Sequence, residues 1–281
     1  MLRRLPSPGR GRRSGGFALI IVLWTLVLIA FIVAHLTASG RTEIRIASNL
    51  VANAVAEAAA EGAISEAIFN LSDPNPDQRW PIDGSARELV VGDSRVLVRL
   101  EDEAWRINPS SASPLLLEAL LRAIGGDSDN ARRLAAGIGE WSGAVAGARS
   151  QDAILADYRA AGLDYGPPGA PFETLDELGR VLGITPSVLA AMRPHLTLFG
   201  PAEPNPASPD PVVAAALADL PRVGPAGVSA NQQQPDVLTV RITATGVGPA
   251  KARIMRAAIV RIGAALLPQG YTVLARGTNF D

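Results

Sequence analysis

The sequence contains no cysteine and only two histidines among 281 residues. The absence of cysteine excludes disulfides, thiol catalysis, thiolate zinc sites and iron–sulfur clusters. A hydroxyl–histidine–carboxylate triad would have to use His195, because His35 lies at the edge of a long apolar run. We expect His195 instead to cap the end of a helix. The sequence therefore predicts that the protein has no catalytic residues and is not an enzyme.

Charge is also scarce, and its two signs are nearly balanced. Charged residues make up 19% of the chain, the formal net charge is −1 and the sequence pI is about 6.2. Such a balance gives no overall attraction to nucleic acid, although an average can hide a local patch. The hydrophobic share of 48% is ordinary for a globular protein, so the chain as a whole is not disordered.

A long apolar run extends from Phe17 to Leu36 and is interrupted only by Thr25 and His35. As a helix it would span roughly 30 Å, the thickness of a bilayer core, so we predict a transmembrane helix at 17–36. Removal of the run as a signal by cleavage near 37–40 and a plain uncleaved anchor remain alternatives. The basic residues before the run place the N-terminus in the cytoplasm and the remaining chain outside. These are Arg3, Arg4, Arg10, Arg12 and Arg13.

The helical pattern continues beyond the membrane run. Residues 37–71 contain no proline and are rich in alanine, and the sequence Ser72–Pro76 is typical of a helix end. We predict one helix of about 55 residues, half in lipid and half a stalk outside it. The apolar positions of the stalk recur at steps of three and four residues, apart from a break near Gly62. They are Ile44, Ala47, Val51, Ala54, Ala58, Ile64, Ile68 and Leu71.

This N-terminus resembles that of type IV pilins and of the pseudopilins of type II secretion. The shared features are a short basic leader that ends in glycine, an aromatic or apolar first mature residue, a membrane run and a continuous stalk. In that family a prepilin peptidase cuts after the glycine and methylates the new N-terminus. The resemblance implies a leader at 1–16, cleavage between Gly16 and Phe17, and N-methylation of Phe17.

One departure from the family pattern is informative. Most pilins carry glutamate at the fifth mature residue, where this chain has Ile21. An unpaired carboxylate in lipid is costly, so a subunit with nothing above it gains by lacking one. The lack of this glutamate is typical of the K-class minor pseudopilin (general secretion pathway protein K), and the resemblance implies a place at the tip. Stalk positions Val51, Ala54 and Ala58 are then expected to contact other minor pseudopilins.

The ectodomain contains two groups of strand-like segments. "ARELVVGDSRVLVRLEDEAW" predicts two strands around Gly92–Asp93, and "DVLTVRITATG", "KARIMRAAIVRIG" and "YTVLAR" predict three more near the C-terminus. We therefore predict an α+β fold in which the long N-terminal helix packs on a small antiparallel sheet. The sheet domain would comprise residues 72–107 and 202–281.

Between the strand groups, residues 108–201 predict an inserted all-α domain. "SPLLLEALLRAIGG", "SDNARRLAAGIGEWSG", "TLDELGRVLG" and "TPSVLAAMRPHL" have the start and stop residues of short amphipathic helices. The order of these parts resembles the K-class pseudopilins, as does the phrase "GPPGAPFETLDELGRVLGITP" at 166–186. The resemblance extends over nearly the whole chain from Phe17.

Some family members bind calcium in the inserted domain, through aspartates that follow a tryptophan. Here Trp141 is followed by "SGAVAGARSQD", so the usual ligands are missing. Calcium requires six to eight oxygens. Asp152, Asp157, Asp164 and Glu173 remain as weak candidates, but their spacing matches no calcium loop. We expect a solvated acidic face and no metal or other cofactor.

The resemblance implies a minor pseudopilin at the tip of the type II secretion pseudopilus, which initiates or caps assembly for protein export. Its partners would be other minor pseudopilins, the prepilin peptidase, the bacterial inner membrane and the secreted substrate, with the C-terminal domain in the periplasm. A minor pilin of a type IV pilus is the nearest alternative. A membrane-anchored helix-hairpin-helix protein is another, because "NPSSASPLLLEALLRAIGG" resembles the start of such a module. Without the leader, 21 basic residues oppose 27 acidic ones, which argues against a nucleic-acid partner.

Overall fold

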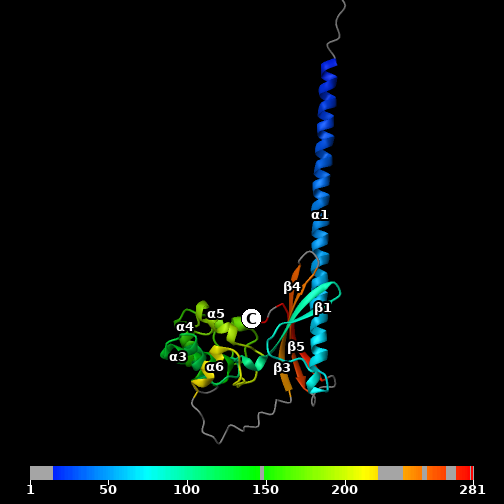
Figure 1. Ribbon diagram of the computed structural model, residues 1–281. Coiled ribbons are helices and arrows are strands. Elements are labelled where there is room, and N and C mark those ends of the chain that lie inside the picture. The colour runs from blue at the N-terminus through cyan, green and yellow to red at the C-terminus, as the bar shows by residue number, and fades with distance from the viewer. Residues whose placement is uncertain are drawn as a thin grey trace, which may run out of the picture. The chain divides into compact units, whose positions relative to one another are not determined.

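The computed structural model describes residues 15–145, 149–220, 237–248, 252–263, 270–278 and 280 (Figure 1). These residues fall into two compact units, which divide after Ala54. The first unit holds the N-terminal part of one long helix. The second holds the rest of that helix, a five-stranded sheet and a helical domain.

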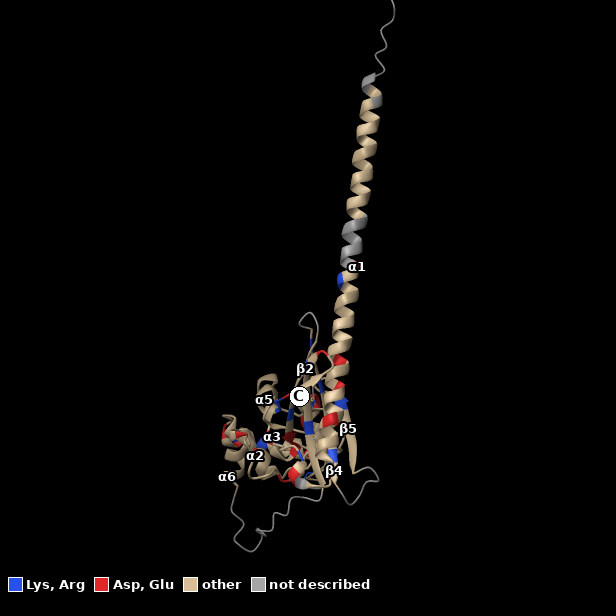
Figure 2. Ribbon diagram, turned by 45° about the vertical axis from the view of Figure 1, so that its right-hand side comes forward, with Lys and Arg blue, Asp and Glu red and all other residues tan. Residues whose placement is uncertain are grey.

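The long helix α1 extends from Gly15 to Leu71 and contains 57 residues. It carries no charged side chain between Phe17 and His35 (Figure 2). Within the described part of the chain, no helix is long and apolar enough to cross a membrane. The predicted span at 17–36 includes Ala18 and Leu36, whose side chains lie outside the described residues, so it stays a prediction. Of the predicted leader, residues 1–14 also lie outside the described residues.

The sheet is antiparallel throughout, and its strands lie in the order in which they occur in the chain, β1-β2-β3-β4-β5. This confirms the predicted α+β class and supplies the strand order, which periodicity alone cannot give. The strands are β1 (Arg87–Val91), β2 (Ser94–Asp102), β3 (Val237–Val247), β4 (Arg253–Gly263) and β5 (Tyr271–Gly277).

The C-terminal part of α1 packs on one face of this sheet. Small alanines and two isoleucines of α1 share a buried cluster with alternate residues of β2, β3 and β4. Gly246 of β3 lies so close to α1 that a Cβ there would be 2.4 Å from the carbonyl oxygen of Ala56. Arg256 pairs with Glu57 and lies 3.7 Å from Glu61, which ties α1 to β4 at the edge of the contact.

The predicted apolar positions of the stalk divide between two faces of α1. Ile64, Ile68 and Leu71 are buried against the sheet, whereas Val51 and Ala58 are exposed. Ile64 follows Ala58 by six residues, which turns the helix by about 240°, so the two groups cannot share a face. The break near Gly62 therefore marks a change from an exposed face to a buried one.

The helical domain is inserted between β2 and β3. It contains the α-helices α2 (Pro114–Ala123), α3 (Ser128–Ser142), α4 (Gln151–Ala160), α5 (Pro186–Met192) and α6 (Pro211–Ala218). Side-chain oxygens of the preceding residues cap their N-termini, among them Ser113, Asp127 and Asp210. Short 3₁₀ segments complete the fold: η1 (Pro76–Gln78), η2 (Glu103–Trp105), η3 (Leu175–Arg180) and η4 (Arg193–His195).

Three details of this domain differ from the prediction. Helix α4 was not expected, and "TLDELGRVLG" forms the 3₁₀ segment η3 in place of an α-helix. The domain also extends beyond the predicted end at residue 201, because α6 packs on α2 and buries Val213 and Ala216 in the same core.

Candidate functional site

The residues predicted for processing lie in the first turns of α1. Gly16 is part of the helix, and Phe17 and Ile21 are 72% and 51% exposed. The carbonyl oxygen of Ile21 accepts a hydrogen bond from the hydroxyl of Thr25 at 2.8 Å. Cleavage and methylation are reactions of the chain with another enzyme, so these roles remain predictions.

The predicted stalk contacts lie on the surface of α1. Val51, Ala54 and Ala58 are exposed, whereas Ala56 and Ala60, on the opposite side of the helix, are fully buried. The exposed face therefore remains available to another helix, while the buried face is occupied by the protein's own sheet. Small side chains on such a face allow close approach of a second helix.

The start of the helical domain is bonded to the segment that follows η4. Ile107 and Leu196 form a parallel bridge, with the amide of Ile107 donating to His195 and the amide of Thr197 donating to Ile107, both at 2.9 Å. The side-chain amide of Asn108 donates to the carbonyl oxygens of Leu198 and Gly200. Main-chain and side-chain bonds thus fasten the start of the domain to a segment about 90 residues later.

A buried charge network lies beside this bridge. Glu103 is fully buried, and its Oε1 is 2.6 Å from the Nε of Arg241, which is also buried. The hydroxyl of Thr197 donates to the other carboxylate oxygen of Glu103. Arg106 lies 3.9 Å from Glu103 and forms a closer pair with Glu101 at 2.6 Å. Because Glu103 follows β2, Arg241 is in β3 and Thr197 follows η4, the network joins the sheet to the helical domain.

Sequence reasoning did not find this network. Arg241 looks like an ordinary outward-facing residue of an alternating strand, and nothing in the local sequence marks Glu103 as buried. The only signal in the sequence is that Arg241 is the single charged residue of β3. Buried charges are paired when they occur, but a sequence does not show which distant residue supplies the pair.

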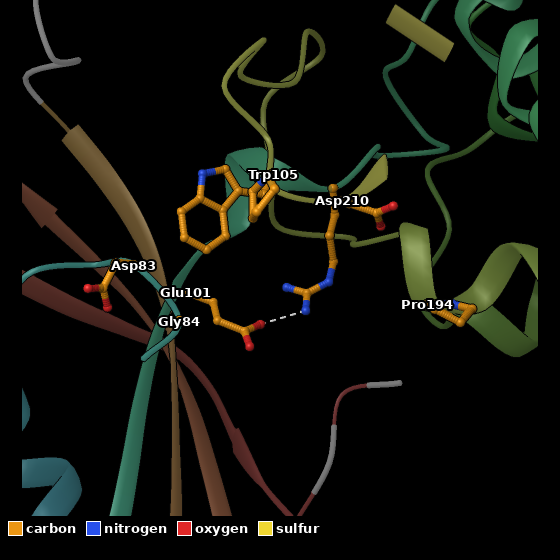
Figure 3. A pocket seen from close by; sticks show the side chains of 8 residues that line it. Asp83, Gly84, Glu101, Trp105, Pro194 and Asp210 are labelled. Atoms are coloured by element: carbon orange, nitrogen blue, oxygen red, sulfur yellow. Dashed lines mark hydrogen bonds and ion pairs between the residues drawn. The ribbon is translucent and has the colours of Figure 1, made fainter. Parts of the chain in front are cut away.

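An open cleft of about 280 Å³ lies next to the network (Figure 3). Burial raises the pKa of Asp102, just behind the cleft wall, against the effect of a hydrogen bond from the amide of Ala104. At the rim, hydrogen bonds from Ser85 lower the pKa of Asp83. The cleft is lined by Asp83, Gly84, Glu101, Trp105, Arg106, Pro194, Pro209 and Asp210.

The side chain of His195 bonds to Asp210 of the cleft wall and does not cap the end of a helix, so that prediction was wrong. Its Nδ1 lies 2.6 Å from an oxygen of Asp210, and the other oxygen of Asp210 accepts from the amides of Val212 and Val213 at the start of α6. The nearby hydroxyl of Ser208 donates to the carbonyl oxygen of Trp105. His195 thus supports the residue that caps α6, which is a structural role.

The four weak calcium candidates are not brought together. Asp157 forms an ion pair with Arg149, whose guanidinium also lies 3.4 Å from Glu140. These contacts, led by the hydrogen bond to Asp157, raise the pKa of Arg149. Across the described ranges, no group of three or more histidine, aspartate or glutamate side chains has the geometry of a metal site. Arg149 therefore supplies the positive charge beside Asp157, and among the described residues no three of the four candidates form a group that could hold a metal ion.

The family phrase around Phe172 contributes to an aromatic core. The Phe172 ring stacks on Trp141 with centroids 6.3 Å apart, and Tyr158 and Tyr165 pack against the same indole. Burial raises the pKa of Tyr158, whose hydroxyl accepts a hydrogen bond from the amide of Leu182. The segment 166–186 therefore contributes to the packing of the helical domain.

The turn between α2 and α3 has the outline of a helical hairpin but not the chemistry of a phosphate site. The amides of Asp129 and Asn130 donate to the carboxylate of Asp127, which caps α3. A phosphate would have to displace this carboxylate and would be repelled by it. The structure therefore does not favour the helix-hairpin-helix alternative.

Comparison with known proteins gives matches to components of type II secretion systems. Residues 95–201, from β2 to the segment that follows η4, match the family model described as type II secretion system protein K. A solved structure with the same fold is a chain of the GspK-GspI-GspJ complex from the enterotoxigenic Escherichia coli type 2 secretion system, with a TM-score of 0.50 and 16% identity. The alignment covers 85% of this chain and 98% of that chain. No curated protein matches the sequence. The family match confirms, over residues 95–201, the resemblance to protein K of the type II secretion system that the sequence predicted, and the solved structure confirms the fold.

Proposed function

We propose that the protein is a minor pseudopilin of a type II secretion system. The observation that carries the proposal is the family match over 95–201, since it begins within the sheet and includes the inserted helices that set this domain apart from a plain pilin fold. The matched solved chain assembles with GspI and GspJ, and we propose equivalent minor pseudopilins as partners here.

Location and processing are part of the same proposal. Its support is the apolar run at 17–36, the arginines before it and the glycine at position 16. The leader 1–16 is removed by a prepilin peptidase, Phe17 becomes the methylated N-terminus, and the ectodomain lies in the periplasm. The glycine suits a protease cleft because a residue without a Cβ lets an extended backbone approach closely.

The proposed place is the tip of the pseudopilus, where the protein initiates or caps assembly. Ile21 offers no carboxylate to a neighbouring subunit, so a position with nothing above it suits this chain. The inserted domain also needs space that an end of the assembly provides more readily than its shaft.

Deletion of the gene in its own organism, followed by complementation, tests the role. We expect loss of secreted enzymes from the medium, rescue by the full chain, and no rescue by a chain with leucine in place of Gly16. Intact mass spectrometry of the rescued protein should show removal of 16 residues and one added methyl group. Unchanged secretion in the deletion strain, or cleavage near Ala38, would contradict the proposal.

A further inference from the structure

One face of the sheet points away from α1, and part of it is uncovered. The side chains that face α1 are the buried ones, such as Val96 and Ile242. Alternate residues of each strand point to the other face. On that face the strand register places Leu97 of β2 opposite Thr245 of β3, which lies opposite Met255 of β4.

The neighbouring row of the same face has the same character. Val90 lies opposite Arg95, Arg95 opposite Val247, and Val247 opposite Arg253. The apolar side chains of the two rows are therefore diagonal neighbours from strand to strand, with Arg95 and Thr245 between them within the rows. We call this surface the ledge and define it by Val90, Leu97, Val247 and Met255, which are 74%, 41%, 39% and 41% exposed.

The same face is covered at its other end. Arg241 and Ile259, which lie opposite each other further along β3 and β4, are buried at 6% and 0% exposure. The buried network of Glu103 lies at this end. The face of the sheet that points away from α1 is thus buried where the helical domain is attached and exposed at the ledge. Among the described residues of the second unit, half of the exposed large hydrophobic ones belong to the ledge. An apolar surface that is contiguous across four strands indicates a contact site better than scattered single residues do.

The polar side chains among the ledge residues are mainly basic. Arg95, Arg99 and Arg253 lie on this face and are exposed, whereas Glu88 is the only acidic residue of the two rows. Glu88 and Arg95 are 3.6 Å apart with both side chains largely exposed, which makes a weak pair. A net positive charge therefore surrounds the apolar centre.

We propose that the ledge binds another protein through a surface on which apolar side chains alternate with carboxylates. Guanidinium groups pair with carboxylates in a bidentate geometry, and the apolar residues between them supply the buried area. The ledge lies on the opposite side of the sheet from α1. A helix packed on the exposed face of α1 lies on the other side of the sheet from the ledge, so the occupant is a protein that approaches from the side away from α1. The inference goes beyond the proposed function and does not depend on it.

Photocrosslinking in cells of the source organism tests the ledge in the full chain. A photoreactive amino acid replaces Leu97 or Met255, and Leu115, which is 57% exposed on α2, serves as the matched control site. We expect Leu97 and Met255 to give one defined conjugate at least tenfold above Leu115. Mass spectrometry should identify its partner and show carboxylates in the crosslinked peptide. The double variant Arg95→Glu/Arg253→Glu should reduce the conjugate at least fivefold, and Arg132→Glu/Arg133→Glu on α3 should not.

Three results would overturn the proposal: no conjugate above the Leu115 level, a conjugate with the α1 helix of another pseudopilin, or a conjugate that charge reversal leaves unchanged. Thermal unfolding of the charge-reversal variant verifies that it is folded. The conjugate yield of the chain that keeps Arg95 and Arg253, measured at raised salt, gives a second measure, since screening should lower this yield. A parallel site at Val51 on α1 separates this proposal from the proposed function. Conjugates at Val51 but none at the ledge would contradict only the proposal that the ledge binds a protein. The absence of conjugates at Val51 would count against the proposed function as a pseudopilin in a helix bundle.

Discussion

The Oε1 of Glu103 lies 2.6 Å from the Nε of Arg241, although 138 residues separate the two in sequence. Both side chains are buried, and the hydroxyl of Thr197 in the helical domain bonds to the same carboxylate. One fully buried carboxylate therefore connects the end of β2, the middle of β3 and the helical domain. The relative position of sheet and domain depends on this contact.

Glu103→Gln should be strongly destabilising. The change leaves the guanidinium of Arg241 buried without its charged partner, which costs about 3–5 kcal/mol in comparable cases. The measurement is urea unfolding of a fragment that begins at Arg41, which we expect to fold alone. Glu88→Gln is the matched control, because its pair with Arg95 is exposed and should contribute less than about 1 kcal/mol. Equal effects of the two variants would show that the buried pair does not hold the domain.

Gly246→Ala should loosen the contact between α1 and the sheet. The added methyl would lie 2.4 Å from the carbonyl oxygen of Ala56, so the helix must move or the strand must bend. Overpacking of this kind costs about 1–3 kcal/mol. Thermal unfolding of the same fragment measures the loss, and Thr245→Ala, half-buried on the opposite face, should change stability by about 0.5 kcal/mol or less. Wild-type stability of the glycine variant would indicate that α1 moves freely at this point.

The pH dependence of stability should reveal the burial of Asp102. Burial raises its pKa above the ordinary value of 3.8, so the folded protein binds the proton more tightly than the unfolded chain does. This contribution is present at low pH and is lost as the pH rises through the folded pKa. In Asp102→Asn the group no longer titrates, while the side-chain oxygen can still accept from Ala104. The melting temperature of the variant minus that of wild type should therefore become more positive from about pH 3 to about pH 6.

Asp83→Asn is the control, because the pKa of Asp83 is shifted in the opposite direction to that of Asp102. Hydrogen bonds from Ser85 lower the pKa of Asp83, so its contribution is present above 3.8 and is lost as the pH falls through the folded pKa. The variant should lose stability relative to wild type near pH 6 and match it in strong acid. Parallel curves for the two asparagine variants would contradict the opposite shifts of the two carboxyl groups.

Calcium should leave the protein unchanged. The positive charge next to Asp157 is already supplied by Arg149, and the described side chains form no group of three or more that could hold a metal ion. Melting temperatures measured with millimolar calcium and with a chelator should agree within error. A rise in melting temperature that saturates with calcium and is abolished by Asp157→Asn would show a metal site that the described side chains do not form.

The stalk offers a test of the tip assignment. Crosslinks from Val51, Ala54 and Ala58 should capture other minor pseudopilins, because these residues form an exposed face of small and branched side chains. Ile21→Glu should reduce secretion only mildly if no subunit is added above this one. Detection of several copies of the protein along one pseudopilus would contradict the assignment.

Local patterns predicted the elements of the sheet well, and the signal is clearest in β2, where buried and more exposed residues alternate from Ser94 to Asp102. Helix α4 was missed because "QDAILADYRA" buries only Ile154 and Tyr158 and has little amphipathic pattern. The end of the helical domain was misplaced for a different reason. Helix α6 packs on α2, and a contact between segments about 100 residues apart leaves no mark on local periodicity.

The parts of the candidate site also differed in how far the sequence could predict them. The exposed stalk positions could be found from helical spacing, although the spacing did not show that Ile64 and Val51 lie on different faces. The Glu103–Arg241 pair and the ledge depend on strand register, which the sequence does not specify until the pairing of β2 with β3 is known.

The place of the insertion has a consequence for how such a protein could arise. The chain leaves the sheet after Asp102 and returns on the adjacent strand, where Asp102 lies opposite Val240. The two strands would be neighbours with or without the helical domain, so a short hairpin turn could join them and leave the strand order unchanged. A domain of more than a hundred residues can thus be gained, exchanged or lost at this point as a cassette, and the host fold need only supply a few anchoring contacts such as Arg241.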